Sequence, residues 1–161
     1  MTDAPPSRDD GLSAPHVLEY AYKRSLGPVL GRFFTGLRDG KIEGIRTRTG
    51  RVLVPPSEYD PETGEATTDA FVEVGPGGVV KSWAWVSEPR GSHPLRHPFA
   101  FALVTFDGAT KPFLHALDVS SPDEVSTGMR VRVRWAEERV GAITDIACFE
   151  PLPAGEEAAP A

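Results

Sequence analysis

HPFAFALVTFDGATKPFLHAL, residues 97–117, contains two apolar runs separated by Asp107-Gly108. In the first run, from Phe99 to Val104, large side chains alternate with small ones, as in a strand that is apolar on both faces. An Asp-Gly pair between two such runs is typical of a tight hairpin turn. The second run, from Pro112 to Leu117, predicts the returning strand. The stretch therefore predicts a buried hairpin of a barrel or sandwich.

Further strands are expected on both sides of this hairpin. They are predicted at Phe71 to Val74, Val79 to Val86, Met129 to Trp135 and Ala142 to Phe149. Together with the hairpin they make six strands, enough to close a small barrel. Trp83 and Trp85 fall on one face of the second strand. Aromatic residues at such positions can stack on nucleic-acid bases, although packing is their more frequent role.

Helices are expected ahead of the strands. The residues from His16 to Leu26 could form a short helix, which Gly27-Pro28 interrupts. Pro28 suits the first position of a second helix, which should run to about Asp39 with Gly40 as its cap. The second helix either packs its apolar stripe on its own chain or offers that stripe to a partner. The stripe consists of Val29, Leu30, Phe33, Phe34 and Leu37.

Composition indicates a soluble protein without a disulfide framework. The 161 residues are 40% hydrophobic and 25% charged, and no apolar run approaches the roughly 20 residues of a membrane span. No secretory signal is visible, and the lone Cys148 cannot form an internal disulfide, which favours a cytoplasmic location. Residues 1–15 and 151–161 are rich in small residues, proline and acidic residues, and we expect both ends to be disordered.

The region from Ile42 to Glu65 contains two short strands with similar turns, Thr49-Gly50 and Thr63-Gly64. A zinc ribbon carries Cys-x-x-Cys at each such turn, because four thiolates close a tetrahedral site. The four corresponding positions here are Arg46, Thr49, Asp60 and Thr63. One carboxylate, two hydroxyls and a guanidinium do not make a zinc site, so we predict a module without metal. Asp60 is expected to stabilise its turn by accepting a hydrogen bond from the backbone N–H of Glu62 or Thr63.

Three motifs together resemble the acyl-CoA-associated OB-fold proteins that carry a rubredoxin-like zinc ribbon. They are GRVLVPP at 50–56, HPFAFALVTFDG at 97–108 and GMRVRVRW at 128–135. The resemblance covers about residues 16–150, although the chain lacks the four ribbon cysteines. It implies a mainly β protein with a helical segment at 16–41, a degenerate zinc ribbon at 42–69 and a five- to six-stranded OB-fold barrel at 70–150.

The same resemblance implies a function. DPETG at 60–64 is similar to the variants associated with actinobacterial breakdown of steroid and lipid side chains. In that setting the family implies a non-catalytic accessory subunit of a thiolase-like enzyme, such as the aldolase that cleaves steroid side-chain acyl-CoA. The expected assembly is a hetero-oligomer in which acyl-CoA is a possible further contact.

The charge pattern disfavours nucleic acid as a ligand. Residues 70–150 carry eight Lys or Arg and ten Asp or Glu, a net charge of −2, whereas nucleic-acid binders are usually basic. Arg130, Arg132 and Arg134 nevertheless line one face of a strand. This face is either a solvated outer surface or a contact for CoA phosphates or an acidic partner.

No catalytic arrangement is evident. The histidines at 16, 93, 97 and 115 have no spacing that pairs them with a nucleophile or a metal, and there is no glycine-rich phosphate loop. We therefore expect no catalytic residue, metal or cofactor. The sequence favours an accessory subunit over an OB-fold module that binds nucleic acid or CoA directly, and over an enzyme acting alone. The candidate contacts for a partner or CoA are Phe33, Phe34, Arg130, Arg132 and Arg134.

Overall fold

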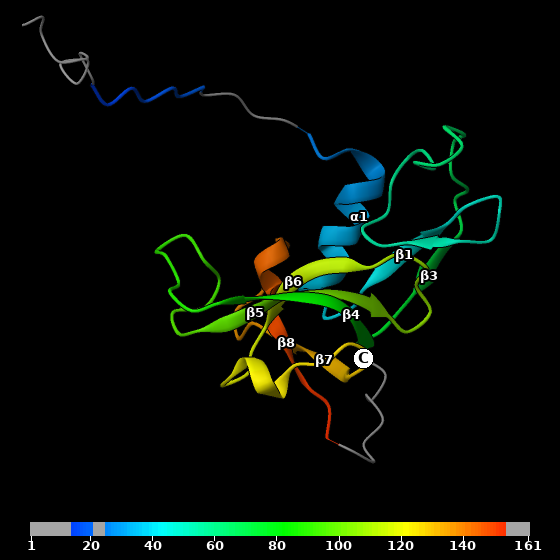
Figure 1. The fold of residues 1–161 in the computed structure, drawn as a ribbon. Helices are drawn as coiled ribbons and strands as arrows, with labels where there is room; N and C mark the ends of the chain where they lie inside the picture. Colours follow the sequence, from blue (N-terminus) through cyan, green and yellow to red (C-terminus); the bar gives the residue numbers. More distant parts are fainter. Residues whose placement is uncertain (1–13, 21–24, 154–161) are drawn as a thin grey trace, which may run out of the picture.

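The computed structural model describes residues 14–20 and 25–153, and Figure 1 shows how their elements are arranged. One helix, α1 (Gly27–Arg38), lies beside a three-stranded sheet of order β2-β1-β3, and a closed barrel of order β4-β5-β6-β8-β7 follows. The strands are β1 (Glu43–Arg46), β2 (Val52–Leu53), β3 (Phe71–Glu73), β4 (Gly77–Val86), β5 (Phe99–Phe106), β6 (Phe113–Leu117), β7 (Arg130–Trp135) and β8 (Ile146–Pro151), with 3-10 turns η1 (Pro122–Glu124) and η2 (Ile143–Asp145). The mainly β architecture with an N-terminal helix and an OB-like barrel is confirmed.

The predicted hairpin forms two adjacent strands of the barrel. β5 and β6 pair antiparallel, with Val104 opposite Phe113 and Ala100 opposite Leu117. The turn between them uses Gly108 at φ +86°, a conformation that favours glycine. The face of β5 with the smaller side chains, including Ala100 and Val104, is fully buried, while Phe101 on the other face is partly exposed. A five-stranded barrel has a narrow interior, and small residues on β5 leave room there for rings from other strands.

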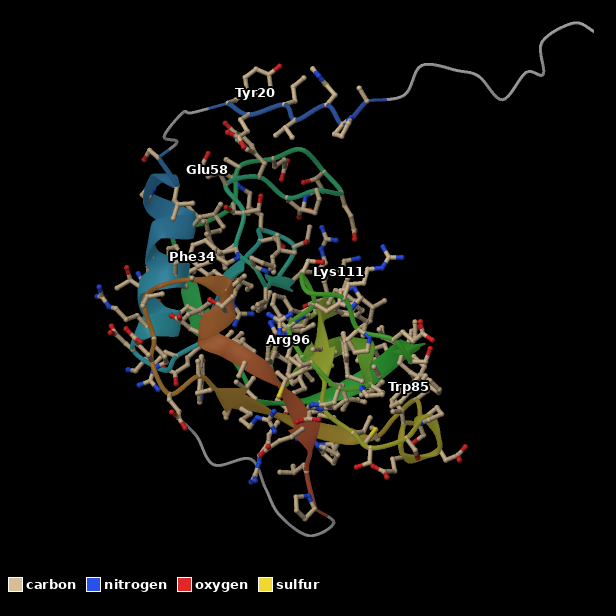
Figure 2. The ribbon with its side chains drawn as sticks, turned by 90° about the vertical axis from the view of Figure 1, so that its left-hand side faces the viewer. Tyr20, Phe34, Glu58, Trp85, Arg96 and Lys111 are labelled. Atoms are coloured by element: carbon tan, nitrogen blue, oxygen red, sulfur yellow. The ribbon has the colours of Figure 1, made fainter. Side chains whose placement is uncertain are left out.

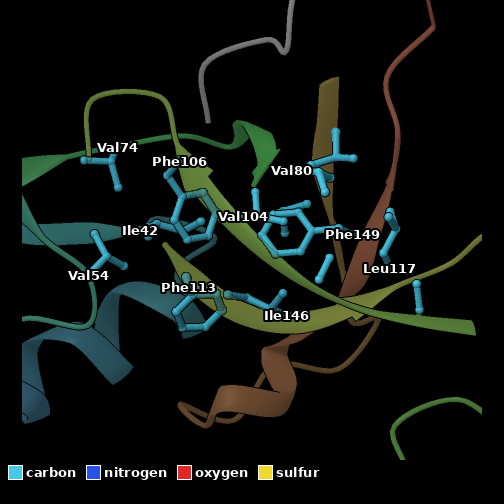
Figure 3. Packing of buried hydrophobic residues seen from close by; sticks show 14 of the residues in the cluster. Ile42, Val54, Val74, Val80, Val104, Phe106, Phe113, Leu117, Ile146 and Phe149 are labelled. Carbon is cyan, nitrogen blue, oxygen red and sulfur yellow. The ribbon is translucent and has the colours of Figure 1, made fainter. Parts of the chain in front are cut away.

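Aromatic rings from β5, β6 and β8 form the barrel core shown in Figure 3. Phe106 lies between Phe113 and Phe149, with ring centroids 5.5 and 5.4 Å away. Val80 and Val104 pack in the same cluster, so β4, β5, β6 and β8 all contribute to one core. Burial of these side chains supplies the main stabilising term of the fold.

Two predicted strands differ from the structure. Residues Phe71–Glu73 pair with β1, Phe71 opposite Ile45, so the barrel has five strands and not six. The chain turns sharply at Gly75, φ +69°, before β4 begins. Residues 142–145 do not extend the last strand, because the Asp145 carboxylate accepts hydrogen bonds from the backbone N–H groups that precede η2, at 2.8–3.2 Å. These bonds favour a tight turn over a strand.

The helical prediction is confirmed only in its second part. Pro28 lies in the first turn of α1, as expected. The first predicted helix is wrong over residues 16–20, which have no regular secondary structure, whereas residues 21–24 lie outside the described residues. Val17, Leu18 and Tyr20 are 74%, 62% and 74% exposed, and a short helix without packing is only marginally stable in water.

The two predicted disordered ends lie mostly outside the described residues. Of residues 1–15 only 14 and 15 are described, and the last described residue is 153. Within the described ranges, no helix has the length and apolar character required to span a membrane.

Candidate functional site

An ion pair joins the two turns of the small sheet region. Nη2 of Arg51 lies 2.5 and 2.6 Å from the two carboxylate oxygens of Asp60. Asp60 is only 3% exposed, and its Oδ1 also accepts the predicted hydrogen bond from the backbone N–H of Glu62, at 2.9 Å. That backbone bond, together with the Arg51 guanidinium, holds the pKa of Asp60 below its usual value. Asp60 is therefore an ionised anchor that connects residues nine positions apart.

The ion pair continues to the barrel. Arg51 also contacts the carboxylate of Glu62, which in turn lies 2.6 Å from Nζ of Lys111. Figure 2 labels Lys111, which follows β5 on the hairpin turn. The neighbouring residue, Thr110, is hydrogen-bonded to β2: its backbone N–H donates to the carbonyl of Val52 at 2.9 Å. We call the chain of charges formed by Asp60, Arg51, Glu62 and Lys111 the knuckle clasp. It joins both turns to the barrel.

All four positions considered for zinc are engaged within the chain. Nη1 of Arg46 donates to the carbonyl of Gly50, and the Thr49 hydroxyl contacts the Thr47 hydroxyl at 2.9 Å. Thr63 Oγ1 accepts from the backbone N–H of Glu65, and Asp60 holds Arg51. Sequence reasoning missed Arg51 because it is not one of the four positions. Its place in GRVLVPP, one residue after the first turn, was the available signal.

We expect chelation to leave the fold unchanged. Treatment of the purified protein with excess EDTA should not shift the melting temperature, because no metal-binding free energy is coupled to folding in this region. Metal analysis of protein purified without chelator provides the second measurement. About one zinc per chain, retained through dialysis, would show that the module binds metal.

The three β7 arginines each face a carboxylate. Arg130 forms two bonds of 2.6 Å with Asp107, and Nε of Arg132 lies 2.8 Å from Glu150. Arg134 contacts Asp118 at 2.6 Å. Asp118 also contacts Nε2 of His97 at 2.7 Å. A phosphate would have to compete with these carboxylates. The interpretation as a phosphate-binding face therefore stays a prediction that this geometry does not favour.

The two candidate phenylalanines of α1 have different environments. Phe33 is fully buried in the main core of its own chain, so its side chain is not available to a partner. Phe34 is partly buried against the same core, and Figure 2 shows it on the helix near the segment that leads to β8. The helical stripe therefore packs mainly on its own chain. Phe34 keeps a partly exposed surface.

An apolar groove lies on the barrel wall. It has a volume of about 470 Å³ and lies between β6 and β8, where these neighbouring strands are paired at one position only, Leu117 opposite Phe149. Its lining comes from the 87–98 loop, β5, β6, η2 and β8, and consists of Pro94, Leu95, Phe101, Leu114, His115, Ala116, Ile143, Thr144, Ile146 and Ala147. We call it the OB-face groove. Sequence reasoning missed it, because it is formed by segments that are distant in the sequence.

The position of the groove is informative. If β4 is counted as the first barrel strand, the groove lies on the second and third strands and next to the loops that follow the first and fourth. This is the face that OB folds use for binding ligands. Leu114 and Ile143 are 60% and 39% exposed on it. The available signal in the sequence was that Leu114 and Ala116 make the second face of the strand apolar as well.

His115 is the titratable side chain of the groove. Its Nδ1 accepts from the backbone N–H of Ala116 at 2.9 Å, and the ring forms a further hydrogen bond with the backbone of Ile143. Burial lowers the pKa of His115 below its usual value, because a charged imidazole is poorly solvated there. The groove wall is therefore neutral at pH 7, and the imidazole is already hydrogen-bonded to the chain.

Acidification should weaken the fold through His115. The unfolded chain binds this proton near pH 6.5 and the folded chain only at lower pH, so the contribution of His115 is complete above about pH 6.5 and is lost below it. Urea unfolding at pH 7.5, 6.5 and 5.5 should show a slope of at most ~1.4 kcal/mol per pH unit from this group. The His115→Asn variant should show a smaller slope. Identical slopes in both proteins would contradict this assignment.

Cys148 is a fully buried free thiol. Burial raises its pKa to about 11, so the thiolate is scarcely populated at neutral pH. No group of three or more His, Cys, Asp or Glu side chains with a metal-binding arrangement occurs within residues 14–20 and 25–153.

The barrel has the architecture of an OB fold, with five strands closed in the order β4-β5-β6-β8-β7. Residues 71–136 match the family model of the ChsH2 C-terminal OB-fold domain. This part of the chain is thus similar to the C-terminal OB-fold domain of ChsH2. The match begins at β3 and ends just after β7. A comparison with curated proteins gave no match.

Two solved structures share the fold. A Sulfolobus solfataricus protein of the DUF35 family, described as having unknown function, is 24% identical with a TM-score of 0.54; the alignment covers 67% of this chain and 77% of that one. The Ltp2-ChsH2(DUF35) aldolase contains a chain that is 22% identical with a TM-score of 0.56, covering 83% of this chain and 98% of that one. These similarities concern the fold of residues well beyond the barrel alone.

Proposed function

We propose that this chain is a non-catalytic accessory subunit that binds and stabilises a thiolase-fold partner acting on acyl-CoA. The observation that carries the proposal is the match of residues 71–136 to the ChsH2 C-terminal OB-fold domain. The shared fold with a chain of the Ltp2-ChsH2(DUF35) aldolase supports a place in an aldolase complex. The thiolase-like nature of the partner, and steroid or lipid side chains as its substrates, follow from the sequence resemblance described above.

The surface supports a protein partner. The OB-face groove is apolar and open, with Leu114 and Ile143 exposed at 60% and 39%. Apolar side chains gathered in a groove are typical of interaction sites, whereas single exposed ones are common on any protein.

Direct binding of nucleic acid or CoA is less well supported. Both ligands present phosphates, and Arg130, Arg132 and Arg134 each already contact a carboxylate. Trp83 and Trp85, the aromatic residues considered for base stacking, pack partly against the main core. A phosphate ligand would therefore need cations other than the β7 arginines.

The test of the proposal is co-purification with the host's thiolase-like proteins. The tagged chain is produced in its source organism, and the subunit that it retains is identified and then produced together with the chain. We expect one complex of fixed stoichiometry in size-exclusion chromatography with light scattering. An obligate interface of this kind buries on the order of 2,000 Å² or more. Elution of the two proteins as separate species at micromolar concentration would contradict the proposal.

A further inference from the structure

The OB-face groove lies where two neighbouring strands of the barrel are paired over a short length. β6 and β8 are neighbours in the barrel but share a single pairing position, Leu117 opposite Phe149. Toward η2 the groove lies between the two strands, with Leu114 and Ala116 on one side and Ile146 on the other. The N–H of Ala116 donates to the imidazole of His115 at 2.9 Å. A strand edge beside apolar side chains is the arrangement that accepts an extended polypeptide.

The polar groups of the groove exclude a charged occupant. His115 is hydrogen-bonded to its own chain and is neutral at pH 7, because burial lowers its pKa. Apart from His115 and Thr144, the lining side chains are hydrocarbon or aromatic. An ionised group placed against them would lose its hydration without gaining a partner. The occupant of the groove itself is therefore apolar and uncharged.

Charge next to the groove indicates what flanks that occupant. The 87–98 loop supplies Pro94 and Leu95 to the lining, and it also carries Arg90 and Arg96 against the single acidic residue Glu88. Both arginines are exposed, and within the described residues neither forms an ion pair with a carboxylate. Arg96 donates to the carbonyl of Gly91 and keeps its charge unneutralised. Figure 2 labels Arg96 among the side chains of the barrel region.

The β7 arginines provide the contrast. Arg130, Arg132 and Arg134 are each matched by a carboxylate within the chain, as described above. Arg90 and Arg96 are therefore among the cations of this domain that can still pair with another molecule. Both lie on the loop that forms one wall of the groove. An acidic partner surface gains more from such unpaired cations than from cations that are already neutralised.

We infer that the OB-face groove is the docking site for an extended apolar segment of the partner subunit, flanked by acidic residues that face Arg90 and Arg96. This inference rests on the proposed function for the existence of the partner. The apolar side chains of the segment fill the groove along β6, centred on Leu114 and Ile143. The acidic flanks orient the segment and increase the association rate.

The test uses the full chain and the thiolase-like subunit that co-purifies with it, produced separately. Leu114→Asp places a charge in the groove, at a side chain that is 60% exposed, so the variant should fold. We expect this substitution to raise the dissociation constant of the complex by roughly 30- to 100-fold, which is the effect of losing a central contact. The matched control is Tyr59→Asp, which puts the same charge on a 59% exposed apolar residue of the small sheet region and should leave the constant within about threefold.

The charged rim has its own measurement. The double variant Arg90→Glu, Arg96→Glu should lower the association rate about tenfold at low salt, and the loss should shrink as salt is raised. Circular dichroism and the melting temperature of each variant show that the chain remains folded. A photo-crosslinker at position 114 should attach to an apolar segment of the partner with acidic neighbours.

The outcomes separate the two proposals. If the wild-type chain binds the partner and the Leu114→Asp variant binds it as tightly as the Tyr59→Asp variant does, the docking site is overturned. The accessory function would still stand. A crosslink from position 114 to a second copy of this chain would also overturn the docking site, because the occupant would then be a self-contact. If wild-type chain and partner do not associate at all, the accessory function fails, and the docking inference fails with it.

Discussion

The Phe33→Asp variant should not fold. Phe33 is 0% exposed and belongs to the main core cluster, with the ring of Phe34 at 5.4 Å. Truncating a buried phenylalanine to alanine costs about 3–5 kcal/mol, and a carboxylate at the same position adds the cost of burying a charge. A domain of this size has a total stability of about 5–15 kcal/mol, so the loss is comparable to the whole. Far-UV circular dichroism and solubility provide the measurement.

The control for this experiment is Thr35→Asp on the same helix. Thr35 is exposed, and its hydroxyl donates only to the carbonyl of Gly31. The substitution should change stability by less than ~1 kcal/mol, as is usual for exposed positions. A folded Phe33→Asp protein with a normal melting temperature would show that the helix does not pack as described.

Breaking the knuckle clasp should give the second largest loss. Arg51→Met removes the guanidinium and leaves the Asp60 carboxylate, which is 3% exposed, with its backbone hydrogen bond from Glu62 but without a counter-ion. Loss of one member of a buried pair is much more damaging than loss of an exposed pair. We expect the melting temperature to fall by on the order of 10 °C. Arg130→Met, which removes an exposed pair with Asp107, should lower it by no more than a few degrees.

A double-mutant cycle makes the prediction specific to the pair. Asp60→Asn keeps an acceptor for the Glu62 N–H but removes the charge that Arg51 faces. The double variant Arg51→Met, Asp60→Asn should therefore be less destabilised than the sum of the two single variants. Additive effects would mean that the contact between the two side chains does not stabilise the fold. The clasp should also weaken in acid, as the pH falls below the usual pKa of aspartate, because the pKa of Asp60 is lowered in the folded chain.

Local sequence signals predicted the centre of the fold well. The alternation around Phe99 and the Asp107-Gly108 turn identified β5 and β6, because a pleated strand and a tight turn both depend on neighbouring residues. The assignment of Phe71–Glu73 to the barrel was wrong, because a short apolar strand does not specify its pairing partner. The short helix considered for residues 16–26 was wrong over residues 16–20, because propensity without packing does not form a stable short helix.

The candidate site was less predictable, because it depends on contacts between distant segments. The alternating arginines of β7 were visible in the sequence, whereas the carboxylates that face them come from the β5–β6 turn, the end of β6 and β8. The OB-face groove likewise combines residues from Pro94 to Ala147. Phe33 and Phe34 are adjacent in the sequence, and only the packing of α1 separates a core side chain from a partly exposed one.

The most direct test of the accessory function is the activity of the partner with and without this chain. The thiolase-like subunit is purified alone and with equimolar chain, and carbon–carbon cleavage of an acyl-CoA substrate is measured together with the oligomeric state. We expect the subunit alone to be poorly soluble or inactive, and the complex to be monodisperse and active. A subunit that is soluble, monodisperse and fully active without this chain would contradict the accessory function.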